Sequence, residues 1–164
     1  MCLSHQLFNR SVLLVPNCYW TGFECDLLGV TKDLRLIDIE IKISRSDLKA
    51  DVKKEKWWVT RPWSRTRNAI NTQPYKPGQR VWPDKVWKHY YAMPEEVWDD
   101  SFNSIISPAS GVVLLRRDAR YFTGTAIRLL KRAKPDKNAK QITTFDVIDL
   151  ARLANLRMWS ALNK

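Results

Sequence analysis

Within the predicted strand at 34–44, residues 37–44 alternate strictly between isoleucine and polar residues, and this pattern limits the folds open to the chain. A period of two is that of a β-strand, whose successive side chains point to opposite faces. One face carries Ile37, Ile39, Ile41 and Ile43, and the other carries Asp38, Glu40, Lys42 and Ser44. Two acids and a lysine in a row are expensive to bury without partners. The strand therefore predicts an ordinary core on one face and a charged site on the other.

The elements around this strand predict an α/β fold. A first strand at 23–30 joins it through a turn near 31–33, and further strands are predicted at 86–93 and 111–116. Ser44 and Asp47 are spaced as a capping box, which predicts a helix from Ser44 to about Trp58. Thr143 and Asp146 open a C-terminal helix at about 144–163, and residues 1–15 are expected to form a short helix. This order favours a mixed sheet covered by helices.

Composition narrows the class of protein. The 164 residues make one domain, predicted to span 1–164, and 45% apolar with 11% aromatic residues excludes the disordered class. The sequence has no stretch of about 18 apolar residues, so we expect no membrane span. Three cysteines are too few for a disulfide scaffold, and the start does not resemble a secretory signal, so a cytoplasmic location is expected.

The net charge of +11 favours a polyanionic partner, and we expect DNA. Residues 44–90 hold twelve Lys or Arg against four acids, together with five of the eight tryptophans. Cations for phosphates and flat rings for bases are what a nucleic-acid surface needs, although tryptophans also simply pack in cores. Four prolines and a glycine mark 60–84 as a long inserted loop. The candidate DNA contacts are Arg45, Lys49, Lys53, Lys54, Lys56, Arg61, Arg65 and Arg67.

The charged face of the strand predicts a metal site. If the turn between the two strands centres on Asp33, Asp26 lies opposite Glu40, about 5 Å away at Cβ. Facing carboxylates repel unless a cation lies between them, and hard oxygen ligands suit Mg²⁺, with Mn²⁺ as a substitute. The candidate ligands are Asp26, Glu40 and the main-chain carbonyl of Ile41, and Lys42 would orient or deprotonate the attacking water in phosphodiester hydrolysis. The alternative is a surface strand on which Asp26 and Glu40 are salt-bridge partners.

These residues also resemble a known pattern. Asp26, thirteen residues, and then Glu40-Ile41-Lys42 is similar to the D…ExK signature of the PD-(D/E)XK nuclease superfamily. The longer segments IDIEIKISRSDLKADVKKEKW, KHYYAMPEEV and SPASGVVLL resemble small bacterial and phage nucleases of the MmcB-like DNA-repair family. The likeness covers about 20–58 and 86–134. Cys25 stands where the signature has proline, and residues 1–23 lack the acid that many relatives carry on an N-terminal helix.

The resemblance implies a three-layer α/β/α, restriction-endonuclease-like core with a central mixed sheet. It also implies a Mg²⁺-dependent DNA endonuclease with Asp26, Glu40 and Lys42 as the active residues, and a homodimer as one assembly to expect. Two alternatives stay open. One is a catalytically inactive nuclease-fold protein that binds DNA in repair or replication. The other is a small basic interaction protein that uses the Trp-rich insertion against a partner protein.

Overall fold

Six strands form one mixed sheet. The structure, a computed structural model, describes residues 11–54, 83–121 and 124–163. The strands lie in chain order across the sheet and are β1 (Ser11–Cys18), β2 (Cys25–Thr31), β3 (Leu36–Ile41), β4 (Val86–Pro94), β5 (Gly111–Arg117) and β6 (Thr125–Lys131). The pairs β1–β2, β2–β3 and β5–β6 are antiparallel, whereas β3–β4 and β4–β5 are parallel. The predicted α/β class with a central mixed sheet is therefore confirmed.

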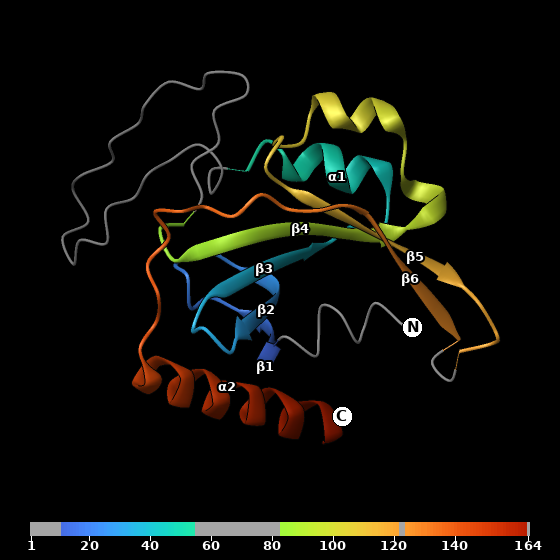
Figure 1. Ribbon diagram of the computed structural model, residues 1–164. Coiled ribbons are helices and arrows are strands. Elements are labelled where there is room, and N and C mark those ends of the chain that lie inside the picture. The colour runs from blue at the N-terminus through green and yellow to red at the C-terminus, as the bar shows by residue number, and fades with distance from the viewer. Residues whose placement is uncertain (1–10, 55–82, 122–123, 164) are drawn as a thin grey trace.

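Two α-helices lie in the described part of the chain, α1 (Arg45–Asp51) and α2 (Thr144–Leu162), with short 3-10 turns η3 (Glu95–Val97) and η4 (Asp100–Ser104) between β4 and β5. In Figure 1, α1 lies beside β4 and β5, and α2 lies at the β1 end of the sheet. Leu48 of α1 packs in a cluster with Tyr91 and Val112. Leu150 of α2 packs in another cluster with Leu28. Alternation and strand register put Tyr91, Val112 and Leu28 on the same face of the sheet.

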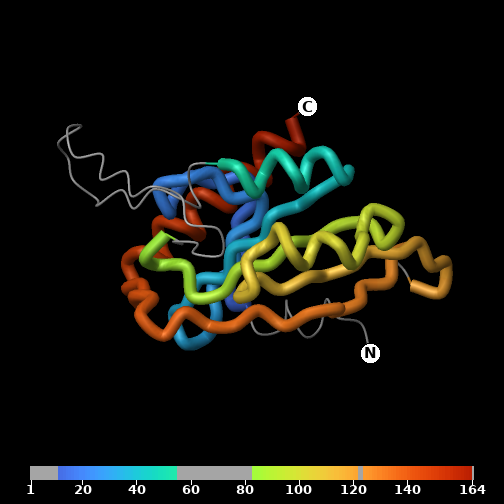
Figure 2. The backbone as a smooth tube through the Cα atoms, turned by 90° about the horizontal axis from the view of Figure 1, so that it is seen from above, coloured from blue at the N-terminus to red at the C-terminus, as the bar shows by residue number. Residues whose placement is uncertain are grey.

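The opposite face has a cluster of its own, which includes Ile37, Ile39, Tyr90 and Val113. The segment between β6 and α2 runs along this side, and Figure 2 shows it in orange, away from α1 in teal. The main-chain N–H of Lys134 donates to the carbonyl of Ala109, just before β5. The N–H of Asp136 donates to the carbonyl of Trp87 in β4, and that of Ile142 donates to the carbonyl of Leu34, just before β3. Ala133 of this segment belongs to the same cluster. The predicted core on the Ile face thus holds for Ile37 and Ile39, whereas Ile41 and Ile43 are exposed.

The hairpin register is the feature that positions the site. Leu27 pairs with Ile39 and Leu28 with Asp38, so the hairpin centres on Asp33 as predicted. The helix starts are also confirmed, because the Ser44 side chain accepts the Asp47 N–H at 3.1 Å and α2 begins with the full Thr143–Asp146 capping box. In α1 the box is incomplete, since the Asp47 carboxylate accepts the N–H of Ile43.

Other predicted elements are wrong in extent or kind. Residues 11–18 form strand β1, whereas a helix was predicted over 1–15. Strand β6 was not predicted at all, and α1 ends at Asp51, short of the predicted Trp58. The apolar residues of α2 are buried only in part, since Leu150 is buried and Met158 is half exposed. The predicted insertion at 60–84 falls almost wholly outside the described residues.

Candidate active site

The polar face of β3 is buried, as its pairing with β4 requires. Asp38, Glu40 and Lys42 are each at most 2% exposed. Lys42 follows the last residue of β3, and its main-chain N–H donates to the carbonyl of Ala92 in β4 at 2.9 Å. That bond continues the pairing of β3 with β4 by one residue, so Lys42 keeps the alternation and stays on the side of Glu40. The isoleucine face is buried only in part, because Ile41 is 44% exposed.

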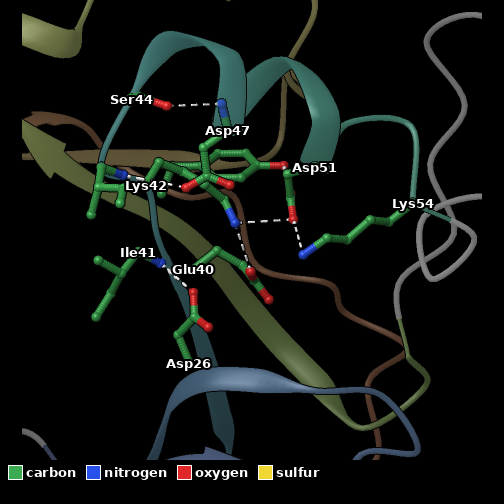
Figure 3. A network of polar contacts seen from close by, with 10 residues as sticks. Asp26, Glu40, Ile41, Lys42, Ser44, Asp47, Asp51 and Lys54 are labelled. Carbon is green, nitrogen blue, oxygen red and sulfur yellow. Dashed lines mark hydrogen bonds and ion pairs between the residues drawn. The ribbon is translucent and has the colours of Figure 1, made fainter.

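The Lys42 ammonium lies between two carboxylates. Its Nζ donates to Glu40 Oε2 at 3.0 Å and to Asp51 Oδ1 at 3.0 Å, as the dashed lines in Figure 3 show. Burial by itself lowers the pKa of Lys42, but the charges and hydrogen bonds of Asp51 and Glu40 outweigh it and raise the pKa above the ordinary value of 10.5. Lys42 is therefore a fixed cation at neutral pH.

Asp26 reaches the same end of the hairpin from β2. The β2–β3 pairing ends at Leu27 and Ile39, and its extension by one residue would set Asp26 opposite Glu40, the arrangement that the sequence predicts. The Ile41 main-chain N–H donates to Asp26 Oδ2 at 2.7 Å. Figure 3 shows the Asp26 carboxylate next to this main chain, on the other side of Glu40 from α1. The hydrogen bond fixes Asp26 against the segment that carries Glu40, Ile41 and Lys42.

The donor set fits a hard divalent cation in kind. Asp26 and Glu40 offer carboxylate oxygens from adjacent strands. Asp26 is partly exposed and Ile41 lies at the surface, so this end of the hairpin can be reached from solvent. Residues 11–54, 83–121 and 124–163 contain no group of three or more His, Cys, Asp or Glu side chains arranged to hold a metal. The predicted ligands, Asp26, Glu40 and the Ile41 carbonyl, include two carboxylates, which is fewer side chains than such a group needs.

Asp51 is the main residue that the sequence did not identify. It is fully buried at the end of α1. Its Oδ1 accepts from Lys42 and lies 2.9 Å from Lys54 Nζ, and its Oδ2 accepts from the Tyr91 hydroxyl at 3.1 Å. No local sequence pattern signals this burial, because it depends on contacts with Lys42 and Tyr91, which lie nine and forty residues away.

Cations line the exposed side of the helix next to the site. Arg45, Lys49, Lys53 and Lys54 are all exposed on or just after α1. Arg45 lies 3.9 Å from Asp99, and Lys54 bonds Asp51, so two of these side chains already have a partner. The other predicted DNA contacts, Lys56, Arg61, Arg65 and Arg67, lie outside the described residues.

His89 is a histidine of β4 that lies next to the polar face of β3. It pairs with Asp38 across β3 and β4 and is fully buried. Its Nδ1 lies 2.9 Å from Ser110 Oγ, and its ring packs edge-on against Tyr91 at 4.6 Å between centroids. These contacts place His89 in the packed layer beneath the site.

Comparisons with known proteins extend the description of the fold. No protein-family model matches the chain, and no curated protein matches it. The chain is similar to a solved structure, the SPO1766 protein of unknown function from Silicibacter pomeroyi. The TM-score is 0.50 and the identity 15%, and the match covers 95% of this chain and 80% of that one. This likeness concerns the fold alone.

Within the described residues, no helix is long and apolar enough to cross a membrane.

Proposed function

We propose that this chain is a metal-dependent DNA endonuclease of the PD-(D/E)XK type, with Asp26, Glu40 and Lys42 as its active residues. The observation that carries the proposal is the buried Lys42 ammonium, 3.0 Å from Glu40 at the end of a hairpin where the Ile41 N–H donates to Asp26. A strand that only faced solvent would leave this lysine exposed. Burying a cation with its counter-charges stabilises a protein little, which favours a functional reason for it.

Asp26, Glu40 and the carbonyl of Ile41 are the groups that would hold Mg²⁺, with Mn²⁺ as a substitute. When bound, such an ion lowers the pKa of a water ligand and offsets charge on the phosphate. The role of Lys42 follows from its charge. A lysine that stays protonated cannot accept the proton of the water, but it stabilises the extra negative charge on the phosphoryl oxygens in the transition state. Water adds to phosphorus, the P–O bond to the leaving sugar oxygen breaks, and that oxygen takes up a proton.

The substrate follows from the charge next to the site. Arg45 and Lys49 are exposed on α1, which begins three residues after Lys42, and Lys53 is exposed just after it. A duplex laid along this helix would bring a backbone phosphate toward the hairpin end while neighbouring phosphates contact the helix. Replacing Lys49 and Lys53 with Glu should weaken DNA binding and reduce its salt dependence by about one unit of slope per lost contact.

The deciding experiment is cleavage of plasmid and branched DNA with Mg²⁺. We expect Asp26→Asn, Glu40→Gln and Lys42→Met each to reduce kcat at least 100-fold, about 2.7 kcal/mol in the barrier, while DNA binding persists. Asp33→Asn is the matched control, an exposed carboxylate at the turn of the same hairpin. If Glu40→Gln cuts as fast as the parent protein, the proposal is wrong.

A second candidate function is favoured by one specific observation. Glu40 is only 1% exposed and is already paired with Lys42, so a divalent cation must compete with the lysine for it. A nuclease-fold protein that binds DNA without cutting it would keep this ion pair permanently. In that case the parent protein binds DNA with the predicted salt dependence, and Mg²⁺ and Mn²⁺ produce no cleavage.

A further inference from the structure

Asp51 has more partners than a structural anchor needs. It is fully buried at the C-terminal end of α1, and its two oxygens accept from Lys42, Lys54 and the Tyr91 hydroxyl. Isolated carboxylates are expensive to bury, and one cation would be enough to offset the charge. Asp51 instead connects three side chains from three separate places in the sequence. The nearest, Lys54, is half exposed, and the farthest in sequence, Tyr91, lies in β4.

The geometry shows what Asp51 does to Lys42. A lysine side chain has four flexible methylene groups and three N–H donors on its ammonium. Glu40 and Asp51 accept two of these donors, each at 3.0 Å, from two different elements of the fold. With two directions fixed, the direction of the third N–H is fixed as well. Figure 3 shows the ammonium between Glu40 and Asp51.

Tyr91 in turn holds Asp51. It pairs with Glu40 across β3 and β4, and it is fully buried. Its hydroxyl donates to Asp51 Oδ2 at 3.1 Å, which leaves Asp51 Oδ1 directed at the two lysines. A rigid β4 side chain thus sets the orientation of a carboxylate at the end of a short helix. This orientation matters because α1 is only seven residues long.

We propose that Asp51 is a positioning residue, which holds the Lys42 ammonium beside Glu40 so that its third N–H is directed at a phosphate oxygen of the substrate. This inference rests on the proposed function and deepens it. The same Asp51 oxygen holds Lys54, whose exposed ammonium is placed to contact a neighbouring phosphate. One buried carboxylate thereby sets the spacing between a buried cation and a surface cation.

The kinetic test compares Asp51→Asn with Asp47→Asn, a matched carboxylate on the same helix whose partner is the Ile43 N–H. Asp51→Asn should lower kcat at least tenfold per folded molecule, with KM for DNA and the Mg²⁺ concentration for half-activation changed less than threefold. Asp47→Asn should leave kcat within twofold of the parent. Tyr91→Phe should lower kcat two- to fivefold. Tyr91→Phe keeps the buried ring, so it serves as the test variant if Asp51→Asn does not fold. The proposal is overturned if folded Asp51→Asn has the same kcat as the parent. If only Tyr91→Phe folds, the same kcat in that variant overturns it.

A spectroscopic measurement separates this inference from the proposed function. In protein labelled with ¹⁵N-lysine, the Lys42 ammonium should give a resolved, slowly exchanging signal, identified by its absence in Lys42→Met. The signal should be lost or shifted in Asp51→Asn, or in Tyr91→Phe where the former is unfolded, and unchanged in Asp47→Asn. If the parent protein cuts no DNA, the proposed function fails, and the signal still tests the positioning. An unchanged Lys42 signal in the folded Asp51 or Tyr91 variant overturns it.

Discussion

Replacing Lys42 with methionine should destabilise the protein far more than removal of an ordinary lysine. Methionine keeps most of the volume of the side chain but removes its charge. Glu40 and Asp51 then remain buried on either side of an apolar group. Removing one partner from a buried ion pair costs about 3–5 kcal/mol, because the remaining charge is left in a medium that solvates it poorly.

The contacts that Glu40 and Asp51 keep in Lys42→Met determine how much stability is lost. Asp51 keeps Lys54 at 2.9 Å and the Tyr91 hydroxyl at 3.1 Å, whereas Glu40 loses its ion pair. We therefore expect the lower end of the range, about 3 kcal/mol. For a chain of this length that corresponds to a fall in Tm of roughly 6–12 °C.

Urea unfolding at pH 7, followed by circular dichroism and by tryptophan fluorescence, measures the change. The matched control is Lys140→Met, which removes a largely exposed lysine 3.3 Å from Asp84 and should change stability by less than about 1 kcal/mol. The double variant Glu40→Gln/Lys42→Met should be more stable than the sum of its single changes implies, because it removes both charges of the ion pair together. If Lys42→Met unfolds within 1 kcal/mol of the parent protein, the buried charge network is not as described.

Three further predictions concern pH, a helix cap and a close contact. The pKa of Lys42 is higher in the folded protein than in the unfolded chain. The contribution of Lys42 to the free energy of unfolding is therefore fully present below its pKa in the unfolded chain, and it is lost as pH rises through its pKa in the folded protein. The stability difference between the parent and Lys42→Met should therefore be constant from pH 6 to pH 9 in urea titrations, and a fall within that window would contradict the assignment. Thr143→Ala removes one half of the α2 capping box and should cost about 1 kcal/mol in thermal unfolding, whereas Thr144→Ala should cost less than half as much. Gly111→Ala would place a Cβ against the ring of Tyr90 and should cost about 3 kcal/mol or prevent folding; a soluble variant of parental Tm would refute this.

The hairpin was predictable because its pattern is local. A strict period of two fixes which side chains share a face, and a turn centred on Asp33 fixes which residues face each other. From these two facts Asp26, Glu40 and Lys42 could be placed together without knowledge of the rest of the chain. The Ser44 and Thr143 caps were predictable for the same reason, since a cap depends on a spacing of three residues.

Asp51 could not be placed in this way, because its burial depends on tertiary contacts. Its neighbours are Lys42, nine residues earlier, and Tyr91, forty residues later, and no local pattern relates them. The same reason explains β1, whose sequence SVLLVPNC has no alternation and includes a proline that strands tolerate at an edge. It is an edge strand, and its pairing with β2 decides its conformation.

The ion pair of Lys42 with Glu40 leads to one more prediction, on metal binding without DNA. If Glu40 is a metal ligand, the lysine at 3.0 Å opposes the ion, and removing its charge should tighten binding. Two unit charges about 4 Å apart interact by about 1 kcal/mol even in bulk water, so Lys42→Met should bind Mn²⁺ at least about fivefold more tightly than the parent. Asp26→Asn should bind it at least tenfold more weakly, and Asp47→Asn should not differ from the parent.

Isothermal titration at 15 °C, where even the destabilised variant stays folded, compares the four proteins. Equal Mn²⁺ affinity in the parent, Lys42→Met and Asp26→Asn would exclude a metal site at this end of the hairpin. Lys42 would then serve only to neutralise Glu40 and Asp51, as the DNA-binding alternative requires.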